Sequence, residues 1–228
     1  MDWLENLENK RRENKKNFSI EVIPSGYEEV DKALGVKGIP RGKIIEIAGH
    51  AGVGKTALIL DIIAQAQMKE LNVVYLDLDR KFDAEFATNR AVKCEELLIF
   101  RPDPDKPENT IEALEHLIIC NLIDVIVFDT ISAFGDGMVS LLAELEKLIV
   151  NTKTTIILAS QIRENWQDPR DYNTPYMKVL NQYSNIRMML KKIESIKHAG
   201  ILIGKRVSVN IYKNCLAHPK STDIEIYV

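Results

Sequence analysis

The sequence lacks the features that mark secreted and membrane proteins. Its three cysteines, Cys94, Cys120 and Cys215, contain no CxxC pair, and an odd number fits no closed disulfide framework. No stretch approaches the roughly 18 uninterrupted apolar residues of a membrane-spanning helix, and the best candidate, residues 117–128, is interrupted by an asparagine and an aspartate. The amino terminus lacks the residue order of a secretory signal. We therefore expect a cytoplasmic protein with free thiols and no membrane partner.

A strong excess of charge is also missing. The formal net charge is −3, from 30 basic and 33 acidic residues, which neither indicates nor excludes a polyanionic partner, because a local basic face can exist on an acidic protein. The one dense basic run, at residues 10–16, fits a solvated tail as well as a contact surface. With 228 residues, of which 46% are hydrophobic, the chain suits one large domain with a short appendage.

From residue 42 onward, short apolar runs alternate with longer segments of helical periodicity. Such runs of β-branched residues are typical of parallel strands that are buried on both faces. The expected strands are residues 43–48, 72–76, 97–100, 124–128 and 155–159, and the expected helices are residues 56–68, 84–91, 110–120 and 139–150. This order predicts βαβ units and therefore a mostly parallel sheet flanked by helices.

The last third of the chain has a different character. Residues 163–175 are polar, include Pro169 and Pro175, and predict a long loop. Further strands are expected at residues 186–193, 201–203, 207–212 and 224–228. We expect them to form antiparallel hairpins, one of which turns at Gly204 and Lys205.

A phosphate-binding pattern, G-x-x-x-x-G-K-[ST], lies between the first expected strand and the first expected helix. Its residues are Gly49, His50, Ala51, Gly52, Val53, Gly54, Lys55 and Thr56. Glycines permit positive φ and let backbone N–H groups surround phosphate oxygens, while the helix directs its N-terminus at the anion. Lys55 would supply a cation to the terminal phosphates, and the Thr56 hydroxyl would ligate Mg²⁺. The strand and helix on either side favour an ATP site over a glycine-rich turn without a ligand.

A magnesium ion in such a site also needs a carboxylate from elsewhere in the chain. Asp129 follows the apolar run at residues 125–128, which places it at the carboxyl end of a buried strand. Ligands gather at that edge of parallel α/β sheets. An aspartate after a strand is common by itself, but together with the phosphate loop it predicts that Thr56 and Asp129 hold the metal.

Several blocks, in the same order, resemble the RecA recombinase family from about residue 23 to residue 228. They are residues 25–35 and 38–47 ahead of the phosphate loop, residues 159–163, which are similar to the family's N-Q-I-R segment, and residues 209–214, which are similar to its strand ending in K-N-K. The resemblance implies a RecA-like P-loop core over residues 23–228, with a mostly parallel sheet and antiparallel C-terminal strands. It also implies ATP and Mg²⁺ as cofactors, and an N-terminal helical or oligomerisation segment at residues 1–22.

Further site residues follow from the resemblance. Asp83 and Phe86 fall where the family contacts and stacks on adenine, although Phe86 also fits a plain core position. Gln161 falls at the γ-phosphate sensor, with an exposed strand-end amide as the alternative. Asp79 replaces the family's water-activating glutamate, and its shorter side chain implies slow hydrolysis or hydrolysis through a second water. The expected catalytic residues are Lys55, Asp79 and Gln161.

The resemblance also assigns contacts outside the chain. Lys213 matches a lysine that reaches the nucleotide of a neighbouring subunit, but Cys215 replaces the second lysine of that motif. The family's first DNA-binding loop, after Thr130, looks deleted, whereas the second keeps its length. The candidate residues for binding single-stranded DNA are Arg163, Trp166, Arg170, Tyr172 and Lys178.

Two functions remain open. The resemblance implies a weak, DNA-stimulated ATPase of recombination or repair, either a recombinase or a paralogue, that acts on single-stranded DNA and forms homo-oligomers. The apolar stripe at Trp3, Leu4 and Leu7 fits a contact with the next subunit as well as packing on the chain's own core. The departures at Asp79 and Cys215 favour a hydrolysis-poor ATP-binding regulatory or mediator protein, which recruits partners without strand exchange. A small-molecule kinase is disfavoured, because the sequence offers no acceptor site and no lid-type arginine cluster.

Overall fold

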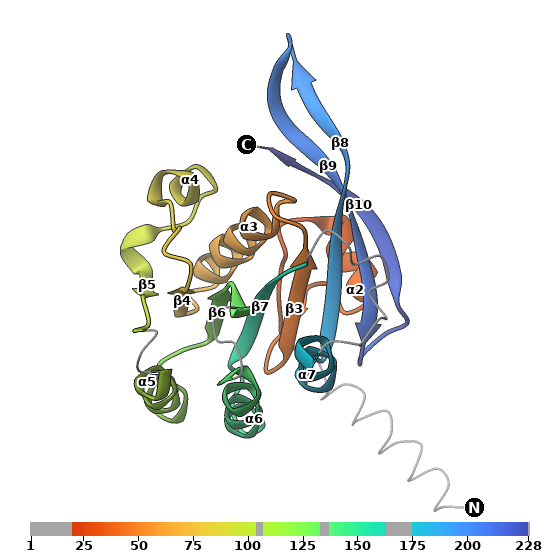
Figure 1. Cartoon of the computed structure of the whole chain (residues 1–228). Coiled ribbons are helices and arrows are strands. Elements are labelled where there is room, and N and C mark those ends of the chain that lie inside the picture. The colour runs from red at the N-terminus through yellow and green to blue at the C-terminus, as the bar shows by residue number, and fades with distance from the viewer. Residues whose placement is uncertain (1–19, 104–106, 133–136, 163–174, 228) are drawn as a thin grey trace, which may run out of the picture.

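The computed structural model describes residues 20–103, 107–132, 137–162 and 175–227. In these parts of the chain one large sheet has the strand order β10-β9-β8-β3-β7-β6-β4-β5 (Figure 1). Its six parallel strands are β3 (Ile44–Gly49), β4 (Val73–Asp77), β5 (Leu97–Phe100), β6 (Val125–Asp129), β7 (Thr155–Gln161) and β8 (Ile186–His198). Antiparallel pairing continues the sheet through β9 (Ile201–Asn214) and β10 (Lys220–Tyr227). The predicted fold class is confirmed.

Helices cover both faces of this sheet. One face packs against α2 (Glu28–Leu34), α3 (Lys55–Met68) and α4 (Ala84–Asn89), and the other against α5 (Pro107–Ile119), α6 (Met138–Ile149) and α7 (Pro175–Tyr183). Successive side chains of a strand point to opposite faces, so Val127 joins the core under α3 while Phe128 joins the core under α6. A short sheet of β1 (Val22–Ile23) and β2 (Ile39–Pro40) and the 3-10 turn η1 (Cys94–Glu96) complete the described elements. No helix in these parts of the chain is long and apolar enough to cross a membrane.

The strand register gathers the expected site residues at one edge of the sheet. Gly49, at the end of β3, lies beside Gln161 of β7, and Asp77 of β4 lies beside Asp129 of β6. All four strands are parallel, so their carboxyl ends meet at this edge. The phosphate loop therefore opens next to the ends of β4, β6 and β7.

The hairpin between β8 and β9 differs from the prediction. Residues 201–214 form one continuous strand, and the chain reverses at Ala199 and Gly200, where φ is 49° and 81°. Two positive φ angles are those of a two-residue turn of the I′ type. Gly204 instead pairs with Tyr227, and a Cβ on it would lie 2.8 Å from the Ile226 carbonyl oxygen. The prediction of a turn at Gly204 and Lys205 was wrong, because this glycine admits a neighbouring strand rather than a turn.

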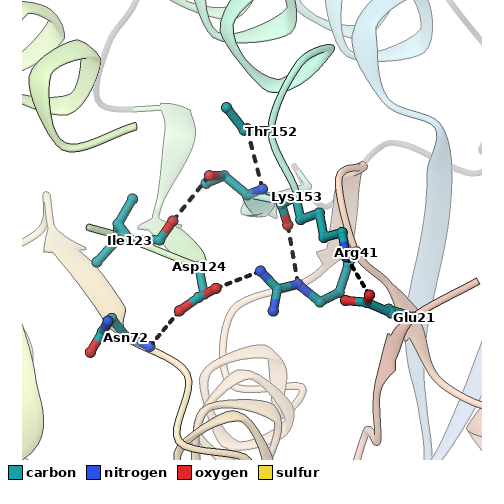
Figure 2. A network of polar contacts seen from close by, with 8 residues as sticks. Glu21, Arg41, Asn72, Ile123, Asp124, Thr152 and Lys153 are labelled. Carbon is teal, nitrogen blue, oxygen red and sulfur yellow. Dashed lines mark hydrogen bonds and ion pairs between the residues drawn. The ribbon is translucent and has the colours of Figure 1, made fainter. Parts of the chain in front are cut away.

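A polar network ties the strands together at the opposite edge of the sheet (Figure 2). The Asp124 carboxylate accepts hydrogen bonds from Arg41 Nη2 at 2.5 Å and from the Asn72 N–H at 2.9 Å. Arg41 Nε donates to the Lys153 carbonyl at 3.2 Å, and Thr154 Oγ1 donates to the Ile123 carbonyl at 3.0 Å. These bonds join the segments that lead into β3, β4, β6 and β7. We interpret the network as structural, since it lies at the other end of the strands from the phosphate loop.

Candidate nucleotide-binding site

The phosphate pattern forms a tight turn between β3 and α3. Gly54 precedes the helix with φ of 117°, and the start of α3 has no side-chain cap, so its first N–H groups are free to bind an anion. Two glycines fit their positions closely: a Cβ on Gly49 would lie 2.9 Å from the Leu190 carbonyl oxygen of β8, and Gly54 combines its positive φ with a Cβ position 2.7 Å from Ile226 Cδ1 of β10. A Cβ on Gly52 would meet nothing within 4 Å. The loop is therefore packed against β8 and β10 on one side and open on the other.

Lys55 is folded back into this turn. Its Nζ donates to the carbonyl oxygens of Gly49 and His50, each at 3.0 Å, and the residue is 7% exposed. Burial lowers the pKa of Lys55, while the nearby carboxylates of Asp129 and Asp79 raise it. A phosphate bound at the loop would favour the charged ammonium further. The lysine is thus placed to pair with an anion above the turn.

Thr56, Asp129 and Tyr75 meet through a single carboxylate oxygen. Thr56 Oγ1 donates to Asp129 Oδ2 at 2.8 Å, and the Tyr75 hydroxyl donates to the same oxygen at 2.7 Å. Burial, followed by the charge of Asp129, raises the pKa of Tyr75, so this hydroxyl remains a donor. Hydroxyl and carboxylate oxygens are the ligands that Mg²⁺ prefers. The residues present therefore fit a magnesium ion at the mouth of the loop.

Such an ion would need ligands beyond the protein. Among the described residues, no group of three or more His, Cys, Asp or Glu side chains is arranged to hold a metal. Magnesium in nucleotide sites usually keeps several waters and is held by one or two carboxylates together with substrate phosphates.

The predicted water-activating residue lies just beyond β4. Asp79 Oδ2 is 3.4 Å from both Thr130 Oγ1 and Lys81 Nζ, and Thr130 directly follows Asp129 in the chain. The preceding turn is ordered by Asp77, whose Oδ1 accepts the N–H groups of Lys81 at 2.8 Å and Phe82 at 3.2 Å. Asp79 is therefore held on the metal side of the loop.

Gln161 ends β7 beside the loop. It lies opposite Gly49 in the parallel register, and the N–H of Ile162 donates to the Gly49 carbonyl at 3.2 Å. Its side chain is exposed, so the amide is available to a ligand at this edge. The assignment of Gln161 as a γ-phosphate sensor stays a prediction.

Comparison with known proteins identifies the family. The family described as RecA N-terminal domain matches residues 9–228. Protein RecA of Heliobacterium modesticaldum is 33% identical over 230 residues, which cover 91% of this chain and 65% of the relative. Protein RecA of Caldanaerobacter subterraneus is 33% identical over 232 residues, with 92% and 67% covered, and that of Herpetosiphon aurantiacus is 34% identical over 230 residues, with 91% and 63% covered. This chain belongs to the RecA family. It spans about two thirds of the length of these relatives.

The two residues that the RecA resemblance assigns to adenine, Asp83 and Phe86, also have structural roles. Asp83 caps α4, because its Oδ1 accepts the N–H of Phe86 at 3.0 Å. Phe86 is half-buried against the core under α3, and the Arg90 guanidinium carbon lies 5.5 Å from its ring centroid. Both explanations of Phe86 therefore remain open, since the ring packs on the core and keeps an exposed part.

Lys213 points away from the phosphate loop of its own chain. It lies in the register of Arg187, near the start of β3, and its Nζ donates to the Asn181 carbonyl of α7 at 2.5 Å. Burial, followed by the charge of Arg187, lowers the pKa of Lys213. The assignment of Lys213 to the nucleotide of a neighbouring subunit stays a prediction.

Most of the predicted DNA-binding residues cannot be placed. Arg163, Trp166, Arg170 and Tyr172 lie outside the described residues, as do Trp3, Leu4 and Leu7 of the predicted oligomerisation segment. Lys178 is exposed on α7. These assignments stay predictions.

Two contacts at the site were missed by sequence reasoning. A tyrosine in a buried strand needs a hydrogen-bond partner, and this general rule could have directed attention to Tyr75, two residues before the end of β4. Lys205 of β9 donates to the Gly52 carbonyl of the phosphate loop at 2.6 Å. No local pattern predicts that contact, because it depends on how the C-terminal hairpin is placed beside the loop.

Proposed function

We propose that this RecA-family chain binds ATP with Mg²⁺ and hydrolyses it weakly in response to single-stranded DNA, in recombination or repair. The observation that carries the proposal is the 2.8 Å hydrogen bond from Thr56 Oγ1 to Asp129 Oδ2, formed beside Lys55 at the open N-terminus of α3. It brings a hydroxyl, a carboxylate, a cation and unpaired N–H groups to one point. This is the donor set that a magnesium triphosphate requires.

The residues divide the work as follows. The N–H groups of the loop and the Lys55 ammonium hold the phosphates, while Thr56 and Asp129 hold the metal. Mg²⁺, when bound, would neutralise the charge that develops on the β- and γ-phosphates. Asp79 orients a water molecule and accepts its proton, over a longer gap than a glutamate would leave. Gln161 contacts the γ-phosphate and couples nucleotide binding to the DNA-binding segment that follows it in the chain.

The proposal also includes assembly. Residues 1–22 would pack onto a neighbouring subunit, leaving residues 23–228 as the ATPase core. Lys213 would then reach the nucleotide of that neighbour, which its position far from its own phosphate loop supports. Single-stranded DNA would contact the segment that begins at Arg163 and ends at Lys178.

The test is ATP turnover and ATP binding, each with and without single-stranded DNA. We expect Lys55→Ala to lose both binding and turnover, and Asp79→Ala to bind ATP while its turnover falls by about 10²-fold. Lys220→Ala, which removes an exposed lysine of β10, is the matched control and should behave as the parent chain. Normal turnover by Asp79→Ala would show that the assigned base is wrong. Tight ATP binding by the parent chain with negligible turnover and no DNA binding would favour the mediator alternative.

A further inference from the structure

We propose that Tyr75 is a positioning residue for the magnesium site, where its hydroxyl fixes the carboxylate of Asp129 in the orientation that receives the metal. This inference rests on the proposed function. Its geometric basis is the 2.7 Å bond from the Tyr75 hydroxyl to Asp129 Oδ2, made by a side chain that is 2% exposed. Tyr75 does not touch the nucleotide in this proposal and acts only through Asp129.

The two donors on Oδ2 define how the carboxylate can be used. An ionised carboxylate has about four acceptor sites, two on each oxygen. Thr56 Oγ1 and the Tyr75 hydroxyl occupy both sites on Oδ2. Oδ1 is therefore the oxygen turned toward a metal or a metal-bound water. Without the tyrosine, Thr56 alone would hold Oδ2, and the carboxylate could rotate about its bond to Cβ.

The tyrosine ring is itself fixed. Tyr75 lies beside Val127 in the register of β4 and β6, so its side chain shares the face of the sheet from which Asp129 projects. The ring also packs edge-on against Phe82, with centroids 5.1 Å apart and planes at 65°. Strand pairing and ring packing together leave the hydroxyl little freedom. A rigid donor of this kind, behind a metal ligand, tunes metal affinity in other proteins by about 10- to 100-fold.

The competing explanation is that Asp129 merely satisfies a buried hydroxyl. On that explanation, Tyr75→Phe would alter stability but leave the metal dependence of nucleotide binding unchanged. If Tyr75 positions Asp129, the variant keeps its affinity for nucleotide in the absence of metal but loses part of the increase in affinity that Mg²⁺ brings. A ratio of two affinities measured on the same folded sample separates the two explanations.

The experiment measures the dissociation constant of a non-hydrolysable ATP analogue by calorimetry, once in Mg²⁺ and once in EDTA. The dissociation constant in EDTA divided by that in Mg²⁺ measures the gain in affinity that the metal brings. We expect Tyr75→Phe to reduce this ratio roughly tenfold relative to the parent chain. The matched control is Tyr27→Phe, which removes a hydroxyl that donates to the Asp61 carboxylate at 2.8 Å, outside the metal site. Its ratio should equal that of the parent chain. Thermal melting establishes that each variant is folded at the assay temperature.

A second background tests whether the tyrosine acts through the aspartate. In an Asp129→Asn chain the metal ligand is impaired, so adding Tyr75→Phe should change the ratio no further. An unchanged ratio in folded Tyr75→Phe, or a full tenfold loss in the Asp129→Asn background, would overturn the proposal. A parent chain that binds no nucleotide would instead refute the proposed function, and the two failures are therefore distinguishable.

Discussion

At the scale of single residues, an ion pair between two strands of the sheet is fully buried. Arg187 Nε of β8 donates to Glu46 Oε2 of β3, and both side chains have no exposed surface. Ser160 Oγ donates to Glu46 Oε1 at 2.6 Å, and the Tyr212 hydroxyl donates to Oε2 at 3.3 Å. Ser160 directly precedes Gln161, so this cluster supports the strand end that flanks the phosphate loop.

We expect Glu46→Gln to lower the free energy of unfolding by about 3–5 kcal/mol, because it removes the buried anion with which Arg187 pairs. The double variant Glu46→Gln/Arg187→Met should recover most of that loss, since it removes the buried charge as well. Urea unfolding of both variants measures the difference. Glu194→Gln, at an exposed site of the hairpin, is the control and should change stability by less than about 0.5 kcal/mol. If Glu46→Gln is as stable as the parent chain, the ion pair with Arg187 does not stabilise the fold.

At the scale of elements, α4 depends on Asp83, the residue that caps its N-terminus. Asp83 accepts the N–H of Phe86 at the start of a helix that buries only Ala87 fully. Asparagine can make the same cap and alanine cannot. We expect Asp83→Ala to destabilise α4 by about 1 kcal/mol, which speeds hydrogen exchange at the Phe86 amide roughly fivefold, and Asp83→Asn to leave it unchanged. If the Phe86 amide exchanges at the same rate in the two variants, the Asp83 cap does not stabilise α4.

The same two variants separate structure from binding. Nucleotide affinity that falls only in Asp83→Ala measures the loss of the helix cap. Affinity that falls equally in both measures a direct contact of the carboxylate with the nucleotide, as the family resemblance implies.

Elements bounded by strong local patterns were the predictable ones. The strands β3, β4, β6 and β7 follow from short β-branched runs, and their observed ends lie within two residues of the prediction. The reversal at Ala199 and Gly200 lacks an asparagine or aspartate before its glycine, so it offered little local evidence of a turn. Helix α7 lies between a predicted loop and a predicted strand and was not anticipated.

The candidate site divides in the same way. The phosphate loop and Asp129 were predictable, because each belongs to a contiguous pattern with a chemical reason. The contacts of Tyr75 with Asp129 and of Lys205 with Gly52 join residues 54 and 153 positions apart. Contacts at such separation arise from strand register and hairpin placement, which composition and periodicity do not specify.

At the scale of the whole molecule, the phosphate loop and Lys213 occupy different parts of the sheet. The loop opens at the carboxyl end of β3, whereas Lys213 lies beside Arg187 on the far side of β8. If Lys213 serves a nucleotide, that nucleotide belongs to another copy of the chain. Repeating such a contact joins two different surfaces and produces a head-to-tail assembly.

This arrangement predicts complementation between two inactive variants. Lys55→Ala chains keep Lys213 but cannot hold nucleotide, whereas Lys213→Ala chains hold nucleotide but offer no lysine to their neighbour. Random mixing in equal amounts makes about one interface in four competent, with an intact site facing an intact Lys213. We therefore expect the mixture to regain about a quarter of the DNA-stimulated ATP turnover of the parent chain. Each variant mixed with Lys220→Ala serves as the control for dilution. A mixture no more active than its separate components would mean that Lys213 does not act between subunits.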